Sequence, residues 1–206
     1  LSLHDALPIF SSKFSGKIFV SGICPRADKF ASKVQPFNDE LADLISQRNS
    51  NSCVFIDNGH VMNLALELYL DNDQYHLNKI GTSALLACIN KFVPILQHGN
   101  NTAFNGEIVN PQNISVVTGH HLHVQDRVLL IGDSELQYMQ EVKFTGQVDV
   151  ECLSGATTKN LQCVFKFMDL ECYSSIIIHV GTNQLKDKPT KFINDYRNML
   201  DTLRER

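Results

Sequence analysis

The chain has 206 residues, of which 43% are hydrophobic and 19% charged, so it is long enough to form one domain with a substantial core. A formal net charge of −4, without a run of lysine or arginine, excludes a general electrostatic attraction to nucleic acid. The apolar runs are strand-sized and too short for a membrane span, so we expect a soluble, cytoplasmic protein.

The beginning of the chain is not expected to belong to the fold. Residues 1–9 resemble the conceptual translation of a sequencing adapter, and they lack the basic start and long apolar core of a secretory signal. We therefore treat residues 1–9 as an adapter-like scar and expect a single domain over residues 10–206.

Strand-like and helix-like segments alternate along the first half of the chain, which predicts an α/β fold with a parallel sheet. Short apolar runs predict strands over 17–21 and 53–56, and hydrophobic residues at helical spacing predict helices over 31–48 and 81–96. Residues 97–125 are rich in Asn, Gly, His and Thr, and this composition predicts a linker or long loop.

The alternation resumes after the linker and continues to the end of the chain. Strands are predicted over 128–131, 147–152 and 175–180, with helices over 135–142 and 158–168. A last helix is predicted from about residue 190, with a buried stripe that consists of Phe192, Ile193, Tyr196, Met199, Leu200 and Leu203.

A Gly132-Asp133-Ser134 turn follows the strand predicted over 128–131. It places a serine at the carboxyl end of the strand, where open α/β sheets build their sites. A serine hydroxyl is a weak nucleophile until a neighbouring base activates it. Taken alone, the turn has a simpler interpretation, in which Ser134 caps the helix that begins at Glu135.

The sequence offers one well-spaced candidate for that base. In Asp73-Gln-Tyr-His76, the histidine can accept the proton of a serine, while Asp73 orients the imidazole and stabilises its charged form. Asp71 is a second candidate for the carboxylate, at a less suitable spacing. The simpler interpretation is a surface turn in which both side chains meet only solvent.

Two further turns contain glycine and follow predicted strands. One is Leu153-Ser154-Gly155-Ala156, and the other is Gly181-Thr182-Asn183, directly after the strand over 175–180. Taken separately, each of these segments is a tight turn that ends a strand.

Together, these four elements resemble the motif blocks of the SGNH (GDS-type) hydrolases. The resemblance implies that Ser134 is the nucleophile, His76 the base and Asp73 its orienting carboxylate. It also implies an oxyanion hole formed by the N–H groups of Ser134 and Gly155 and the side-chain amide of Asn183. The expected activity is that of a serine esterase on a small acyl, acetyl-type carboxylic ester, with no cofactor and no metal.

The resemblance further implies a three-layer α/β/α, flavodoxin-like fold with a five-stranded parallel sheet. In the family the Asp-x-x-His block comes last, whereas here it precedes the other three, so we expect a circular permutation. Residues 10–96 would form the usual C-terminal half and residues 126–206 the usual N-terminal half, joined by the linker 97–125. The residues around these motif blocks are most similar to those of the esterase domains in the first open reading frame of LINE-type retrotransposons. Glu135 departs from the family, where leucine often follows the nucleophile.

The sequence is also compatible with other functions and contains other candidate sites. The main alternative is a catalytically inactive or chimeric remnant of a mobile-element protein that serves, if at all, as an assembly module. An acyltransferase with the same residues is a weaker one. We expect His179 to be a packed strand residue, the histidines at 120, 121 and 123 to bind no metal, and the cysteines to be buried reduced thiols. The sequence gives no indication of the oligomeric state.

Overall fold

The computed structural model describes residues 14–48, 52–59, 66–95, 127–144 and 146–204. The scar predicted over 1–9, the linker predicted over 97–125 and the histidines at 120, 121 and 123 lie outside the described residues. None of the helices in the described ranges is long and apolar enough to cross a membrane.

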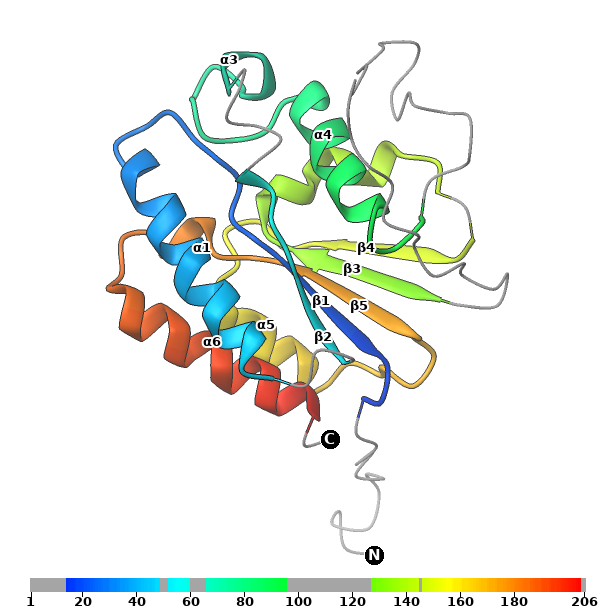
Figure 1. The fold of residues 1–206 in the computed structure, drawn as a ribbon. Coiled ribbons are helices and arrows are strands. Elements are labelled where there is room, and N and C mark those ends of the chain that lie inside the picture. Colours follow the sequence, from blue (N-terminus) through cyan, green and yellow to red (C-terminus); the bar gives the residue numbers. More distant parts are fainter. Residues whose placement is uncertain (1–13, 49–51, 60–65, 96–126, 145, 205–206) are drawn as a thin grey trace, which may run out of the picture.

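A five-stranded sheet with all neighbouring strands parallel forms the centre of the structure (Figure 1). This confirms the predicted fold class, a flavodoxin-like α/β/α arrangement. The strands run in the spatial order β2-β1-β5-β3-β4. Their bounds are Lys17–Ser21 for β1, Cys53–Ile56 for β2, Val128–Gly132 for β3, Val148–Cys152 for β4 and Ser175–His179 for β5.

The strand order agrees with the permutation predicted from the motif order. If the strands are counted from β3 through β5 and then on to β1 and β2, the spatial order becomes 2-1-3-4-5, the flavodoxin-like order. The last helix and the start of β1 are also neighbours: the N–H of Phe14 donates to the carbonyl of Leu203 at 3.3 Å, and Arg204 donates to the carbonyls of Phe14 and Gly16. The permutation itself stays a prediction.

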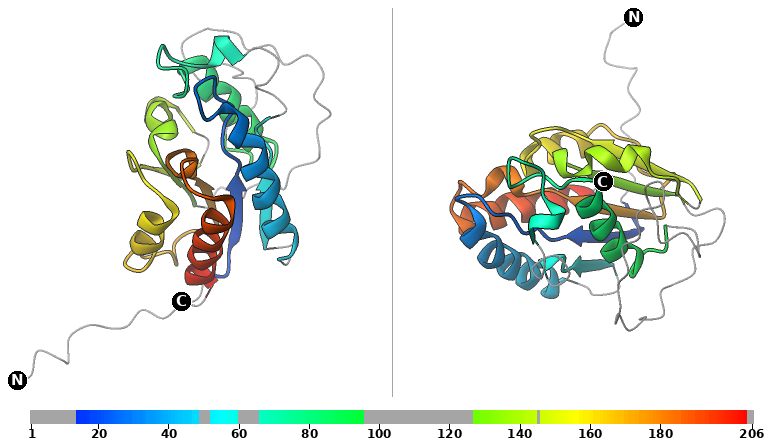
Figure 2. Two further views of the ribbon diagram at one scale, coloured as in Figure 1. Left: turned by 90° about the vertical axis from the view of Figure 1, so that its left-hand side faces the viewer. Right: turned by 90° about the horizontal axis from the view of Figure 1, so that it is seen from above.

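Helices cover both faces of the sheet because its strands carry apolar side chains on both sides (Figure 2). In β1, Ile18 and Val20 point into one core, whereas Phe19 points into the other. The first core is closed by α1 (Ala31–Ser46), α5 (Thr158–Phe165) and α6 (Pro189–Arg204). The second is closed by α4 (Lys79–Asn90) and the 3₁₀ helix η1 (Ser134–Glu141).

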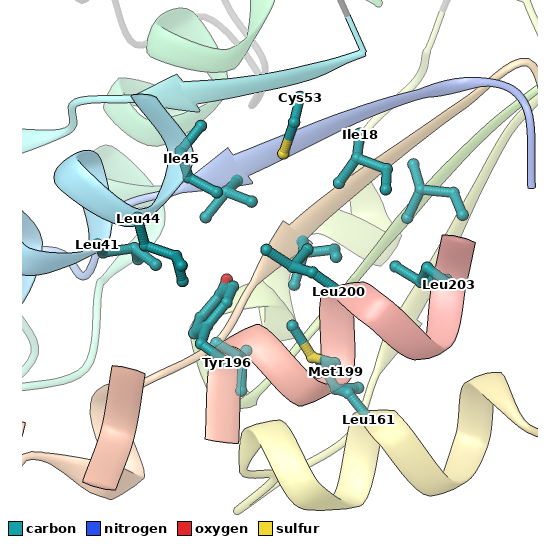
Figure 3. Close-up of a cluster of buried hydrophobic side chains, with 14 of the residues drawn as sticks. Ile18, Leu41, Leu44, Ile45, Cys53, Leu161, Tyr196, Met199, Leu200 and Leu203 are labelled. Atoms are coloured by element: carbon teal, nitrogen blue, oxygen red, sulfur yellow. The ribbon is translucent and has the colours of Figure 1, made fainter. Parts of the chain in front are cut away.

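The first core is organised around α6, whose apolar stripe meets α1, α5 and the sheet (Figure 3). Tyr196 lies between α1 and α6 and has no exposed surface. Its ring meets that of Phe192 edge-on at 5.5 Å, and Phe192 packs against Phe37 at 5.0 Å. All the residues of the predicted stripe are buried, which confirms it: Phe192, Ile193, Tyr196, Met199, Leu200 and Leu203.

Several helices differ from the predicted ones for local reasons. The helix predicted over 81–96 begins two residues earlier and ends at Asn90. It begins earlier because the side chain of Asn78 caps it by accepting from the N–H of Gly81 at 2.9 Å. The helix predicted over 135–142 is the 3₁₀ helix η1, and Asp133, not Ser134, is its N-cap. A short helix, α3 (Leu66–Tyr69), was not predicted at all.

Gly132 is required at the end of β3 because the neighbouring strand approaches its backbone closely. A Cβ there would lie 2.0 Å from the carbonyl oxygen of His179, which is backbone and cannot rotate away. We expect Gly132→Ala to lower the free energy of unfolding by more than roughly 3 kcal/mol, beyond the usual range for overpacking.

The matched control is Gly146→Ala, since a Cβ at Gly146 would meet nothing within 4 Å. Its φ of +83° leaves only the backbone strain of a left-handed residue, roughly 1–2 kcal/mol. Urea denaturation measures both variants, and equal losses of stability would contradict the close approach at Gly132.

Candidate active site

Three of the four motif blocks lie at the carboxyl edge of neighbouring strands. Ser134 follows β3, Gly155 follows β4, and Asn183 lies in the 3₁₀ turn η2 (Thr182–Gln184) that follows β5. Because β5, β3 and β4 are adjacent and parallel, their ends meet at one edge of the sheet. The fourth block lies in the loop that connects α3 to α4.

The structure brings the three proposed catalytic side chains into one hydrogen-bonded series. The Nε2 atom of His76 lies 3.0 Å from the Oγ atom of Ser134, although the two residues are 58 positions apart. The Nδ1 atom of His76 lies 2.6 Å from Oδ2 of Asp73. The carboxylate of Asp71 instead accepts from the hydroxyl of Tyr138 at 3.5 Å, so the carboxylate that contacts the imidazole is that of Asp73. The distances of 3.0 and 2.6 Å at the two nitrogens of His76 lie within hydrogen-bonding range, as a Ser-His-Asp series would require.

Asp73 shapes the loop as well as orienting the imidazole. Its Oδ1 atom accepts from the N–H groups of Tyr75 and His76, each at 3.0 Å, which leaves Oδ2 for the ring. Gln74, which lies between Asp73 and Tyr75, adopts a left-handed backbone with a φ of 65°. Partial burial opposes ionisation, but the hydrogen bonds from His76 and Tyr75 hold the pKa of Asp73 below its ordinary value. The carboxylate therefore stays charged beside the imidazole.

The connection from β1 to α1 supports this loop from outside. The N–H of Ala27 donates to the carbonyl of Gln74 at 2.9 Å. The guanidinium of Arg26 lies 5.0 Å from the centre of the Tyr75 ring, a cation–π distance, and the Tyr75 ring lies 4.1 Å from that of His76. Sequence reasoning missed Arg26 and Tyr75, because Arg26 meets the Tyr75 ring only when the β1–α1 connection packs against the loop in the fold.

The proposed oxyanion donors come from the two remaining turns and the nucleophile. Ser134 is the first residue of η1, so its N–H has no acceptor within the helix. Gly155 has a φ of +73°, which other residues rarely adopt. The Nδ2 atom of Asn183 donates to the carbonyl of Ala156 at 3.1 Å, which holds the amide against the Gly155 turn. A second N–H of that amide stays available.

Two buried carboxyls, those of Asp133 and Glu135, flank Ser134 in the sequence. Asp133 has no exposed surface, and its Oδ1 atom accepts from the N–H of Glu135 at 3.1 Å. Glu135 is 2% exposed, and its Oε2 atom accepts from the N–H of Leu77 at 3.1 Å. Burial raises the pKa of Asp133 to about 6, and burial together with the charge of Asp133 raises the pKa of Glu135 to about 8. At neutral pH Glu135 is therefore mostly a neutral carboxyl.

His179 and the cysteines lie apart from the hydrogen-bonded series. His179 is buried, its Nδ1 atom lies 3.0 Å from the hydroxyl of Ser21, and burial lowers its pKa to about 4. This confirms a packed, neutral strand residue. All six cysteines are free, but Cys163 and Cys172 are exposed, so the prediction of buried thiols is wrong for these two because both lie on the solvent side of their segments. No cluster of three metal-ligating side chains occurs in the described part of the chain.

The buried carboxyl of Glu135 predicts a specific dependence of stability on pH. Between its ordinary pKa of 4.5 and its raised pKa of about 8, the folded protein holds a proton that the unfolded chain has lost. This contribution is complete below pH 4.5, and it is lost as the pH rises to about 8. Between pH 5 and pH 8, wild type should lose on the order of 3 kcal/mol more than Glu135→Gln, which cannot ionise. Urea denaturation at both pH values checks this, and equal losses in the two proteins would contradict it.

Comparison with known proteins does not assign the chain to a family. No model of a known protein family matches the chain, and no similar chain is found among curated proteins or solved structures. The resemblance to SGNH hydrolases therefore rests on the residues and their geometry, and it stays a prediction.

Proposed function

We propose that this chain is a serine hydrolase of the SGNH type that cleaves a small acyl ester. One observation carries the proposal: the hydrogen-bonded series from Ser134 through His76 to Asp73, which joins elements 58 positions apart. A surface turn whose histidine met only solvent would not place the imidazole 3.0 Å from the hydroxyl at a strand end.

The geometry fits acyl transfer in two steps. In the first, Oγ of Ser134 attacks the carbonyl carbon while Nε2 of His76 takes the hydroxyl proton. The imidazolium then gives this proton to the leaving alcohol as the ester bond breaks, and an acyl-serine remains. In the second step a water attacks the acyl carbon, His76 takes its proton, and the carboxylic acid leaves as the serine regains the proton.

Asp73 supports both steps by its charge. The imidazole becomes positively charged whenever it accepts a proton, and a carboxylate 2.6 Å from Nδ1 stabilises that charge. The same contact fixes the tautomer with the proton on Nδ1, so that Nε2 faces Ser134 as an acceptor. The lowered pKa of Asp73 keeps this carboxylate ionised.

Negative charge that develops on the carbonyl oxygen needs fixed donors. The N–H groups of Ser134 and Gly155 and the amide of Asn183 come from three neighbouring strand ends, so they are held by the sheet. Each such donor contributes about 10²- to 10³-fold to the rate in enzymes of this kind.

We also infer that the domain is a circular permutant of the SGNH fold. The strand order counted from β3 and the contact between Phe14 and Leu203 support this inference. In such a permutant the half-sites come together in space although their order along the chain is reversed.

The serine is tested by hydrolysis of an acetyl or butyryl chromogenic ester. Ser134→Ala should abolish the enzyme-dependent rate, because no nucleophile remains, while thermal melting stays close to that of wild type. Ser154→Ala is the matched control, since Ser154 is an exposed serine at the same edge of the sheet. Equal rates for wild type and Ser134→Ala would exclude Ser134 as the nucleophile. A product formed with an added alcohol would identify an acyltransferase instead.

A further inference from the structure

Glu135 makes a contact that links the two halves of the proposed site. It directly follows the nucleophile, and its Oε2 atom accepts from the N–H of Leu77, the residue directly after His76. The two contacts Ser134–His76 and Glu135–Leu77 thus lie side by side and join the same two segments. The Ser134–His76 contact joins the proposed reactive atoms, while the Glu135–Leu77 contact joins a buried side chain to a backbone amide.

Glu135 is buried, so its hydrogen bond with Leu77 compensates for lost hydration. A carboxyl removed from water is destabilising unless hydrogen bonds compensate for the lost hydration. The neighbouring residues of η1 that enter the second core are apolar, namely Leu136 and Met139. An apolar residue in place of Glu135 would avoid the desolvation, but it would leave the N–H of Leu77 without this acceptor.

Other contacts between η1 and the histidine segment are weaker. The hydroxyl of Tyr138 reaches Asp71 at 3.5 Å, at the limit of hydrogen bonding. Lys79 and Glu141 form an ion pair at 3.0 Å, with both side chains 54% exposed. Exposed pairs of this kind contribute little, because water and salt screen them. The contact of Glu135 differs because it is buried and fixed at both ends.

Both ends of this contact are rigid. The N–H of Glu135 donates to the buried carboxylate of Asp133 at 3.1 Å, which fixes the start of η1. On the other side, Leu77 is 1% exposed and bridges to Leu70 in an antiparallel pair. A hydrogen bond between two fixed groups transmits position, since neither can move without the other.

We infer that Glu135 is a positioning residue, which holds the imidazole of His76 at reacting distance from Ser134 through the backbone amide of Leu77. The inference rests on the proposed function, and it deepens that function by naming what aligns its two half-sites. Displacement of a catalytic group by about 1 Å lowers rates on the order of 10²-fold, so a single well-placed acceptor is sufficient to matter.

The role requires a hydrogen-bond acceptor and not a negative charge. Glutamine has the same length and carries a carbonyl oxygen that can accept from Leu77, whereas methionine has a similar volume and no strong acceptor. Glu135→Gln should therefore keep the turnover number, and Glu135→Met should lose it. Glu141→Gln is the matched control, because it breaks the exposed contact between the same two segments.

The experiment measures kcat and KM for the ester substrate and the hydrogen exchange of the Leu77 amide by NMR in all four proteins. We expect Glu135→Met to lower kcat about 10²-fold with little change in KM, and to speed exchange at Leu77. Glu135→Gln and Glu141→Gln should remain within several-fold of wild type in kcat and should keep slow exchange. If Glu135→Met does not fold, replacement of Leu77 by its α-hydroxy analogue deletes the donor instead, and the same loss of kcat is expected.

The outcomes separate this inference from the proposed function. An active wild type with unchanged kcat and unchanged Leu77 exchange in Glu135→Met overturns the inference alone. The same follows if Glu135→Gln is as impaired as Glu135→Met, since charge would then be the required property. A folded wild type without Ser134-dependent hydrolysis overturns the proposed function, and the inference with it.

Discussion

The parallel pairing of β1 with β5 is the interaction on which the candidate site depends. β1 belongs to the half of the chain that carries His76, and β5 belongs to the half that carries Ser134. Their pairing over Lys17–Ser21 and Ser175–His179 joins both halves into one sheet with helices on both faces. Without it, β1 and β2 would be separate from the part of the sheet that carries Ser134.

The second requirement is precise placement of the histidine loop against the sheet edge. Asp73 gives the loop its shape, Arg26 and Tyr75 support it from outside, and Glu135 attaches it to the nucleophile turn. The site thus contains charged and polar groups at partly and fully buried positions, where each must be paired to be tolerated. Such pairing is directional, so it defines the relative position of Ser134 and His76.

Much of the fold could be predicted from sequence because β1, β2, β3 and β5 are mainly apolar runs followed by glycine or polar turns, while β4 alternates apolar and acidic residues. For the same reason the serine and the histidine could be proposed from Gly132-Asp133-Ser134 and the Asp-x-x-His spacing. The contact of Glu135 with Leu77 could not, because it joins residues 58 positions apart. The hydrophobic spacing also did not distinguish the 3₁₀ helix η1 from an α-helix. The buried carboxyl beside Ser134 appears in the sequence only as a departure from the expected leucine. The sequence could have predicted Asp133 as the N-cap of η1, since aspartate is a common N-cap residue.

The most direct measurement is the rate at which a fluorophosphonate probe labels the protein, with the modified residue located by mass spectrometry. A functional site predicts one adduct, on Ser134, that forms rapidly in wild type and in Asp71→Asn. Labelling of Asp73→Asn should be slower by orders of magnitude, because the carboxylate beside the imidazole is lost, whereas the carboxylate of Asp71 accepts from the hydroxyl of Tyr138 and not from the imidazole. No adduct on Ser134 in the folded wild type, or equal rates in the two aspartate variants, would contradict a catalytic series of Ser134, His76 and Asp73.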